Sequence, residues 1–235
     1  MDVNALYYMM GDQPLLLALI AVMILGFIAQ GGVRRTFARY SQVRSASGRS
    51  ASEIAGRLLS DAGSGATIAR VGGRLTDHYD PRSNVVGLSE QVYDSDSVAA
   101  LAVAAHEIGH VMQYEQGYVP IRIRNAILPV ASFGSQAAPF IVIIGLLMGS
   151  FDLAFAGVIL FGAVLVFQIV TLPVEFNASH RAIEMLTSGG YLGYDEATGA
   201  KRVLRAAAMT YVVAALASAI TLLRFLMLAN RNRRR

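Results

Sequence analysis

Four long apolar segments dominate this chain and limit what it can fold into. They cover about residues 5–30, 127–149, 153–172 and 206–229. A helix that crosses the hydrocarbon core of a bilayer needs roughly 20 mostly apolar residues. Hydrophobic residues make up 54% of the chain and charged residues only 15%, whereas about 25% of a typical soluble domain is charged. We therefore expect a mainly α integral membrane protein with about four transmembrane helices.

The sequence also predicts the shape of the second apolar segment and the nature of the first. Pro129 and Pro139 lie in the second segment and are expected to kink or shorten it, because proline lacks a backbone N–H group. The first segment is not expected to be a cleaved signal peptide. No basic residue precedes it, and no small-residue cleavage site follows it.

The distribution of basic residues predicts the orientation in the membrane. Residues 31–125 hold eleven arginines and residues 173–205 hold four basic residues, whereas no Lys or Arg precedes the first apolar segment. Cytoplasmic loops carry an excess of Lys and Arg, so both stretches are expected in the cytoplasm. The arginines at positions 231 and 233–235 disagree with this orientation, so the fourth segment can instead be re-entrant or interfacial. We expect residues 1–235 to form a single membrane-embedded domain of the cell membrane.

The first polar stretch is expected to form a small cytoplasmic α+β part. Residues 50–62 have the spacing of a short amphipathic helix. Residues 66–71, 74–79 and 85–88 are β-compatible runs separated by turn residues. A longer helix, capped by Asp94 or Asp96, is expected to run to Gln116 and to stop at Gly117.

That longer helix contains the residues that carry the chemistry, His106-Glu107-Ile108-Gly109-His110. Two histidines four positions apart project from one helix face and can bind one Zn²⁺ through their imidazoles. Glu107 stands beside the first histidine, where it can take a proton from a zinc-bound water. This spacing is typical of zinc metallopeptidases. The alternative interpretation is a pair of solvated or structural histidines on an amphipathic helix.

A catalytic zinc site needs a third protein ligand and an open position for water. The chain has no cysteine, so the choice lies between His78, His180 and a carboxylate. Glu175 is the best carboxylate, because Pro173 suits the first turn of a helix that follows the third apolar segment. A tight membrane hairpin would bring that helix close to His110. The alternative role for Glu175 is a carboxylate that favours the helix dipole.

At these residues the chain resembles the bacterial family of membrane-bound neutral zinc metallopeptidases of the YugP type. More distantly it is similar to the HtpX and CAAX-prenyl membrane peptidases. The matching stretches are residues 77–82, 88–89, 104–110 with Gln113, 128–130, 172–182 and 206–214. The resemblance implies a zincin-like fold of the gluzincin type, with His106, His110 and Glu175 as zinc ligands and Glu107 as general base. The chain departs from the family pattern in having Asn177 for an aspartate and His180 for an arginine.

These observations predict a zinc-dependent membrane endopeptidase that hydrolyses peptide bonds at the cytoplasmic membrane face, with Glu107 activating a zinc-bound water. The expected cofactor is Zn²⁺, and the expected partners are a peptide or membrane-protein substrate and the lipid bilayer, with no nucleic acid. The alternative is a non-catalytic membrane scaffold with a structural or vestigial zinc site. A transporter is disfavoured because ionisable residues are nearly absent from the apolar segments. The oligomeric state is left open.

Two further expectations concern the substrate. The strand at residues 85–88 could pair edgewise with an extended peptide, and the alternative is an ordinary strand within the sheet. The candidates for stabilising the oxyanion are His180 and the tyrosines Tyr79, Tyr114, Tyr191 and Tyr194.

Overall fold

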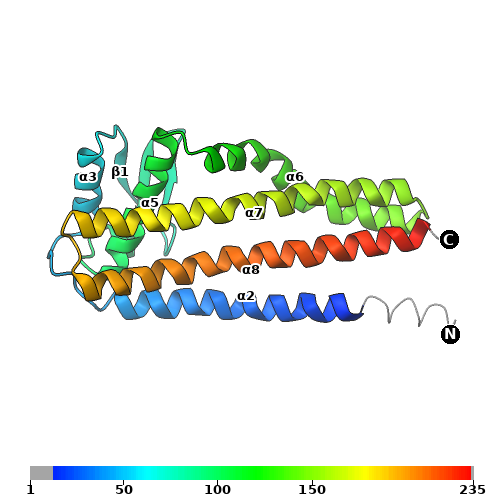
Figure 1. The fold of residues 1–235 in the computed structure, drawn as a ribbon, viewed down its shortest axis with the longest axis horizontal. Coiled ribbons are helices and arrows are strands. Elements are labelled where there is room, and N and C mark those ends of the chain that lie inside the picture. The colour runs from blue at the N-terminus through cyan, green and yellow to red at the C-terminus, as the bar shows by residue number, and fades with distance from the viewer. Residues whose placement is uncertain (1–12, 234–235) are drawn as a thin grey trace. The chain divides into compact units, whose positions relative to one another are not determined.

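The computed structural model describes residues 13–233 of the chain, and Figure 1 shows its elements. In chain order these are α2 (Gln13–Tyr40), α3 (Ala51–Asp61), β1 (Thr67–Val71), β2 (His78–Asp80), β3 (Val85–Ser89), α4 (Glu90–Tyr93), α5 (Val98–Glu115), α6 (Val119–Leu147), α7 (Phe151–Ser188) and α8 (Tyr194–Arg233). Backbone contacts divide them into two compact units. Within the described residues, the apolar unit comprises 13–28, 123–172 and 210–233, and the polar unit comprises 29–122 and 173–209.

Within residues 13–233, four helices, α2, α6, α7 and α8, are long and apolar enough by length and composition to cross a membrane. The prediction of a mainly helical chain with four candidate spans and a small sheet is therefore confirmed. Each of these helices extends beyond its apolar segment, since α2 continues to Tyr40 and α7 continues to Ser188. Hydrophobicity marks the part of a helix that suits a bilayer, and it does not mark where the helix ends. The predicted start of the first span, residues 5–12, lies outside the described residues.

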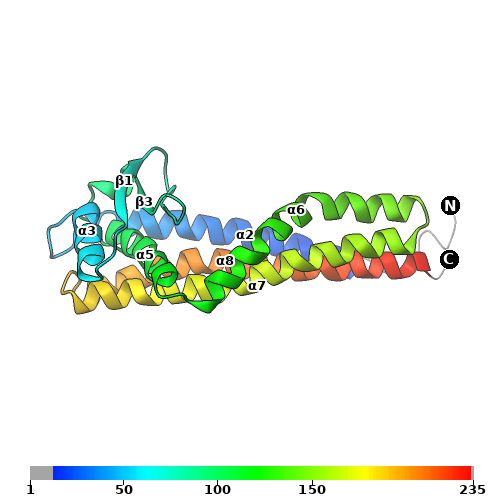
Figure 2. The same cartoon turned by 90° about the horizontal axis from the view of Figure 1, so that it is seen from above.

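In the apolar unit, α6 and the first part of α7 form a close helical hairpin built on glycines. A Cβ atom at Gly134 would lie 2.8 Å from the carbonyl oxygen of Leu160, and one at Gly157 would lie 2.9 Å from the backbone nitrogen of Val142. Small residues let membrane helices approach this closely. Pro129 and Pro139 lie inside α6, and Figure 2 shows that this helix is bent, as the sequence predicted.

Pro173 does not begin a new helix, and the prediction that it does is wrong. It lies inside α7, which is one continuous helix from Phe151 to Ser188. An interior proline removes one backbone hydrogen bond, and α7 tolerates this loss. The end of the helix, before Gly189 and Gly190, is where the sequence placed it.

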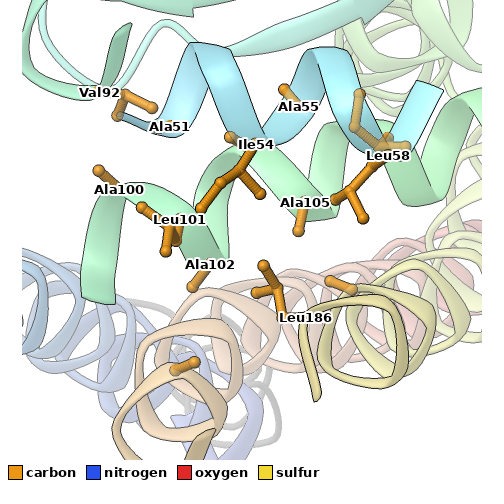
Figure 3. Close-up of a cluster of buried hydrophobic side chains, with 14 of the residues drawn as sticks. Ala51, Ile54, Ala55, Leu58, Val92, Ala100, Leu101, Ala102, Ala105 and Leu186 are labelled. Atoms are coloured by element: carbon orange, nitrogen blue, oxygen red, sulfur yellow. The ribbon is translucent and has the colours of Figure 1, made fainter. Parts of the chain in front are cut away.

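In the polar unit, α3 packs against α5 over a buried apolar cluster (Figure 3). Ile54 of α3 and Leu101 of α5 are fully buried in it, together with Leu186 of α7. The predicted amphipathic helix is confirmed. It begins after Ser50, whose hydroxyl accepts from the backbone N–H of Glu53 while the Glu53 carboxylate accepts from the backbone N–H of Ser50.

The residue that caps α5 differs from the prediction. Ser97 is the cap, and its hydroxyl accepts from the backbone N–H of Ala100 at 3.2 Å. Asp96 is instead paired with Arg44 at 2.8 Å, and Asp94 is paired with Arg70. These aspartates are used in ion pairs with segments far away in the sequence, which local sequence pattern does not reveal.

The sheet has the strand order β1-β3-β2, with β1 parallel and β2 antiparallel to β3. The expected strand at residues 74–79 is mostly wrong, because only its end belongs to β2. Gly73 and Leu75 both have positive φ angles, and this interrupts an extended conformation. Of the two interpretations of residues 85–88, the ordinary sheet strand is the one observed, since β3 is bonded on both sides and has no edge for a substrate. The edge strands are β1 and β2, and β2 contacts α5.

Helices α5 and α7 meet at a point where there is no room for a side chain. A Cβ atom at Gly109 would lie 2.6 Å from the carbonyl oxygen of Ala178 and 3.1 Å from its Cα atom. Both of these are backbone atoms, which cannot rotate away. Gly109 is thus required for the backbones of the two helices to touch.

We predict that Gly109→Ala destabilises the protein by about 1–3 kcal/mol, because α5 and α7 must move apart. The loss should exceed the gain of about 1 kcal/mol that alanine brings to a helix interior. Gly56→Ala in α3 is the matched control, since its Cβ atom would meet only a side-chain carbon of Ile68 at 3.8 Å. Thermal unfolding of both variants in detergent measures the difference. Equal stability of the two variants would contradict this account of the helix contact.

Candidate metal centre

Three side chains from two helices converge in the polar unit. His106 and His110 lie one turn apart on α5, with their ring centres 4.8 Å apart. Glu175 of α7 places Oε2 at 3.4 Å from Nε2 of His106 and at 3.8 Å from Nε2 of His110. One ligand atom from each of the three lies within 4.8 Å of the others. The three side chains that the sequence paired thus lie together, and their role as zinc ligands stays a prediction.

The other ring nitrogen of each histidine faces a polar side chain. Nδ1 of His106 lies 3.2 Å from the hydroxyl of Ser179. Nδ1 of His110 lies 3.0 Å from Oε1 of Gln113. In metal sites, a partner on the second ring nitrogen holds the imidazole in place and leaves the first nitrogen directed at the ion. Both rings are therefore held with Nε2 toward Glu175.

Glu107 lies beside this group and is almost completely buried, with 8% of its surface exposed. Burial raises the pKa of its carboxyl to about 7. The charge of His106 lowers this pKa, and the charges of Asp77 and Glu175 raise it further. The pKa of His106 is raised as well. Burial opposes this shift, but the hydrogen bond to Glu175 and the charges of Glu107 and Glu175 outweigh it. The site thus favours positive charge even without a metal ion.

Neither of the two other histidines joins this cluster. His78 is exposed on β2, and its Nδ1 lies 2.8 Å from the carbonyl oxygen of Thr76. His180 is exposed on α7, five positions after Glu175. At about 100° per residue it lies on a different face of that helix. Of the three alternatives for the third ligand, the carboxylate of Glu175 is therefore the one that lies with His106 and His110.

The tyrosines that are candidates for stabilising the oxyanion differ in their surroundings. The Tyr79 hydroxyl donates to Asn84 at 2.8 Å, and its ring meets that of Tyr114 edge to face. Tyr191 packs against the buried apolar cluster, and Tyr194 is 89% exposed. The oxyanion role of any of these side chains stays a prediction.

Sequence reasoning gave no role to Gln113 or Ser179. Gln113 lies three positions after His110, and Ser179 lies four positions after Glu175. Each is therefore on the same helix face as a candidate ligand, and this spacing is the signal that could have identified them. Asn177, which replaces an aspartate of the family pattern, contacts neither histidine among the described hydrogen bonds. It instead accepts from Gln113 and from Arg181.

The raised pKa of Glu107 predicts a pH dependence of stability for the metal-free protein. Between about pH 4.5 and pH 7 the folded chain keeps a proton on Glu107 that the unfolded chain has released. The free energy of unfolding should therefore fall by about 3 kcal/mol as the pH rises through this window. Glu107→Gln removes this contribution, since it cannot ionise.

Thermal unfolding with a chelator, from about pH 5 to pH 8, compares the variant with the wild type. We expect the stability advantage of Glu107→Gln to grow with pH. A difference that stays constant across the window would show that Glu107 ionises normally.

The sequence was compared with protein-family models and with known proteins. A family model described as "Putative neutral zinc metallopeptidase" matches residues 15–230. The chain is also 46% identical over 210 residues to a protein of Bacillus subtilis (strain 168) described as "Putative membrane protease YugP", which covers 89% of this chain and 93% of that protein. No solved structure matches the chain. The chain therefore belongs to this family of neutral zinc metallopeptidases, as its sequence pattern predicted.

Proposed function

We propose that this protein is a zinc-dependent membrane endopeptidase that hydrolyses peptide bonds at the cytoplasmic face of the cell membrane. The observation that carries the proposal is the convergence of His106, His110 and Glu175 beside the buried carboxyl of Glu107. The family supports a protease and zinc as its metal. The proposal assigns the three converging residues as zinc ligands and Glu107 as the catalytic base.

The three side chains fit zinc in chemistry and in spacing. Imidazole nitrogen and carboxylate oxygen are ordinary zinc ligands, and atoms about 2.0–2.1 Å from a tetrahedral ion lie about 3.3 Å from one another. The separations of 3.4 and 3.8 Å from Glu175 to the two histidines are close to this value, and all three ligand atoms lie within 4.8 Å of one another. Three protein ligands leave a fourth position open, as a catalytic zinc site requires.

Glu107 is suited to move a proton during peptide hydrolysis. Zinc bound at the site would supply a Lewis acid for the peptide carbonyl and a positive charge that favours the ionised form of a nearby carboxyl. The Glu107 carboxylate then takes a proton from the attacking water and delivers it to the leaving amine. Its burial keeps it out of bulk water, so the proton stays near the reacting groups.

The four candidate membrane helices support a multi-pass membrane location. The excess of basic residues in the stretches 31–125 and 173–205, which carry the site, supports its placement in the cytoplasm. We propose peptides or membrane proteins as the substrates. The alternative function, a scaffold with a structural zinc, needs the three ligands but has no use for a base beside them.

The roles of ligand and base can be separated by two variants. We expect His106→Ala to abolish zinc binding, measured as metal content of the purified protein, because only two ligands remain. His180→Ala is the matched control and should keep one zinc per chain, since His180 lies outside the cluster.

Glu107→Gln should retain the metal but lower the rate of casein cleavage by about 10²–10⁴-fold, the contribution of a general base. Full cleavage by this variant would exclude the proposed mechanism. A wild-type protein that holds zinc but cleaves no peptide would favour the scaffold.

The orientation can be tested directly because the chain contains no cysteine. Arg82 and Asp152 are both exposed. Arg82 lies in the stretch predicted to be cytoplasmic, and Asp152 lies in the short turn between the second and third apolar segments, which the same orientation places outside the cell. A membrane-impermeant maleimide should label Asp152→Cys in intact cells and Arg82→Cys only after permeabilisation. The reverse pattern would place the site outside the cytoplasm.

A further inference from the structure

We propose that Arg181, acting through Asn177 and Gln113, fixes the proton of His110 on Nδ1, so that the unprotonated Nε2, which faces Glu175, is the atom that binds the metal. The three residues are positioning residues, because none of them is a proposed metal ligand. The expected effect on metal affinity rests on the proposed function, because it assumes that His110 binds zinc. The structural part of the inference concerns the metal-free protein alone.

The four side chains form one continuous chain of hydrogen bonds. Nε of Arg181 donates to Oδ1 of Asn177 at 2.8 Å. Nε2 of Gln113 donates to the same Oδ1 at 3.0 Å and to the carbonyl oxygen of Val174 at 2.7 Å. Oε1 of Gln113 lies 3.0 Å from Nδ1 of His110. Gln113 is fully buried, so water does not replace these partners.

The direction of every bond in this chain follows from its first member. An arginine side chain can donate but cannot accept, so Asn177 must turn its carbonyl oxygen toward Arg181. That oxygen and the Val174 carbonyl are both acceptors, so Gln113 must turn its amide NH₂ group toward them. Its own carbonyl oxygen then faces His110. The neutral His110 ring satisfies this oxygen only if Nδ1 carries the proton, which leaves the lone pair on Nε2.

Arg181 is itself held in place from the other helix. Its Nη1 donates to Oε1 of Gln116 at 2.5 Å. Gln116 follows the last residue of α5, whereas Arg181 lies on α7. Hydrogen bonds thus connect α7 to the end of α5 at two points, Gln113 and Gln116. The position of Arg181 therefore depends on the packing of these two helices.

The same geometry explains how the chain can have Asn177 where the family pattern has an aspartate. Asn177 acts only as an acceptor for Arg181 and Gln113, and an amide oxygen does this as a carboxylate oxygen would. No negative charge is needed at this position for the direction of the bonds to be set.

His106 provides an internal comparison. Its Nδ1 faces the hydroxyl of Ser179, which can rotate to donate or to accept. No fixed donor sets the direction of that bond. Ser179→Ala is therefore the matched control, because it removes a ring partner from His106 and leaves the chain of bonds to His110 intact.

The experiment uses full-length protein with ¹⁵N-labelled histidine, stripped of metal. The histidine signals are followed to alkaline pH until they no longer change, so that neutral rings are compared. The nitrogen chemical shifts of His110 report which ring nitrogen carries the proton. We expect the Nδ1–H form in the wild type and in Asn177→Asp. In Gln113→Met and Arg181→Met we expect a mixture of both forms. Ser179→Ala should change the signals of His106 alone.

Zinc affinity, measured by competition with a chromogenic chelator, is the second readout. Gln113→Met should weaken zinc binding by about 10- to 100-fold, as is typical for the loss of a partner of a ligating histidine. Arg181→Met should cause a smaller loss. Arg57→Met, at an exposed position of α3, should cause none.

Several outcomes would overturn the inference. These are an Nε2–H form of His110 in the wild type, an unchanged Nδ1–H form in both methionine variants, or a loss of that form in Asn177→Asp. If the methionine variants fail to fold, the wild type and Asn177→Asp still decide the question. If the wild type binds no zinc, the proposed function fails, whereas the chemical shifts still test the inference.

Discussion

The site depends on the contact between the backbones of α5 and α7 at Gly109 and Ala178. Successive turns of α5 place His106 and His110 in a row, and α7 places Glu175 opposite that row. A side chain at Gly109 would hold the helices apart and move the carboxylate away from both imidazoles. The short distances at the site are therefore a consequence of one missing Cβ atom. The hydrogen bonds from Gln113 and Arg181 across the same helix pair depend on this contact as well.

The site combines groups that are costly to bury with partners that offset the cost. Glu107 and Glu175 are both nearly inaccessible to solvent. Removing a carboxylate from water is unfavourable unless a positive charge or a hydrogen bond compensates it. In the metal-free protein, the raised pKa values of Glu107 and His106 reflect this need for positive charge, because each group holds its proton more tightly than usual. A divalent cation held by the two histidines and Glu175 would meet it, which is the electrostatic reason for assigning a metal to this place.

The features that could be predicted from the sequence are those with a local signal. They are the four apolar helices, the amphipathic helix that follows Ser50 and the histidine pair of α5, because spacing along one helix determines which residues share a face. Features that depend on contacts between distant segments could not be predicted. Asp96 pairs with Arg44 and does not cap α5. Likewise, the roles of Gln113 and Asn177 follow from contacts between residues more than sixty positions apart. Pro173 is a separate failure, because α7 continues through a proline that usually begins or ends a helix.

The central claim is that one zinc ion is bound by side chains of both helices. An anomalous difference map at the zinc edge, from crystals of the zinc-loaded full-length protein, tests it most directly. The account predicts one peak per chain, about 2.0–2.2 Å from Nε2 of His106, Nε2 of His110 and the carboxylate of Glu175. A peak at His78 or His180 instead, or a peak that Glu175 does not approach, would contradict it.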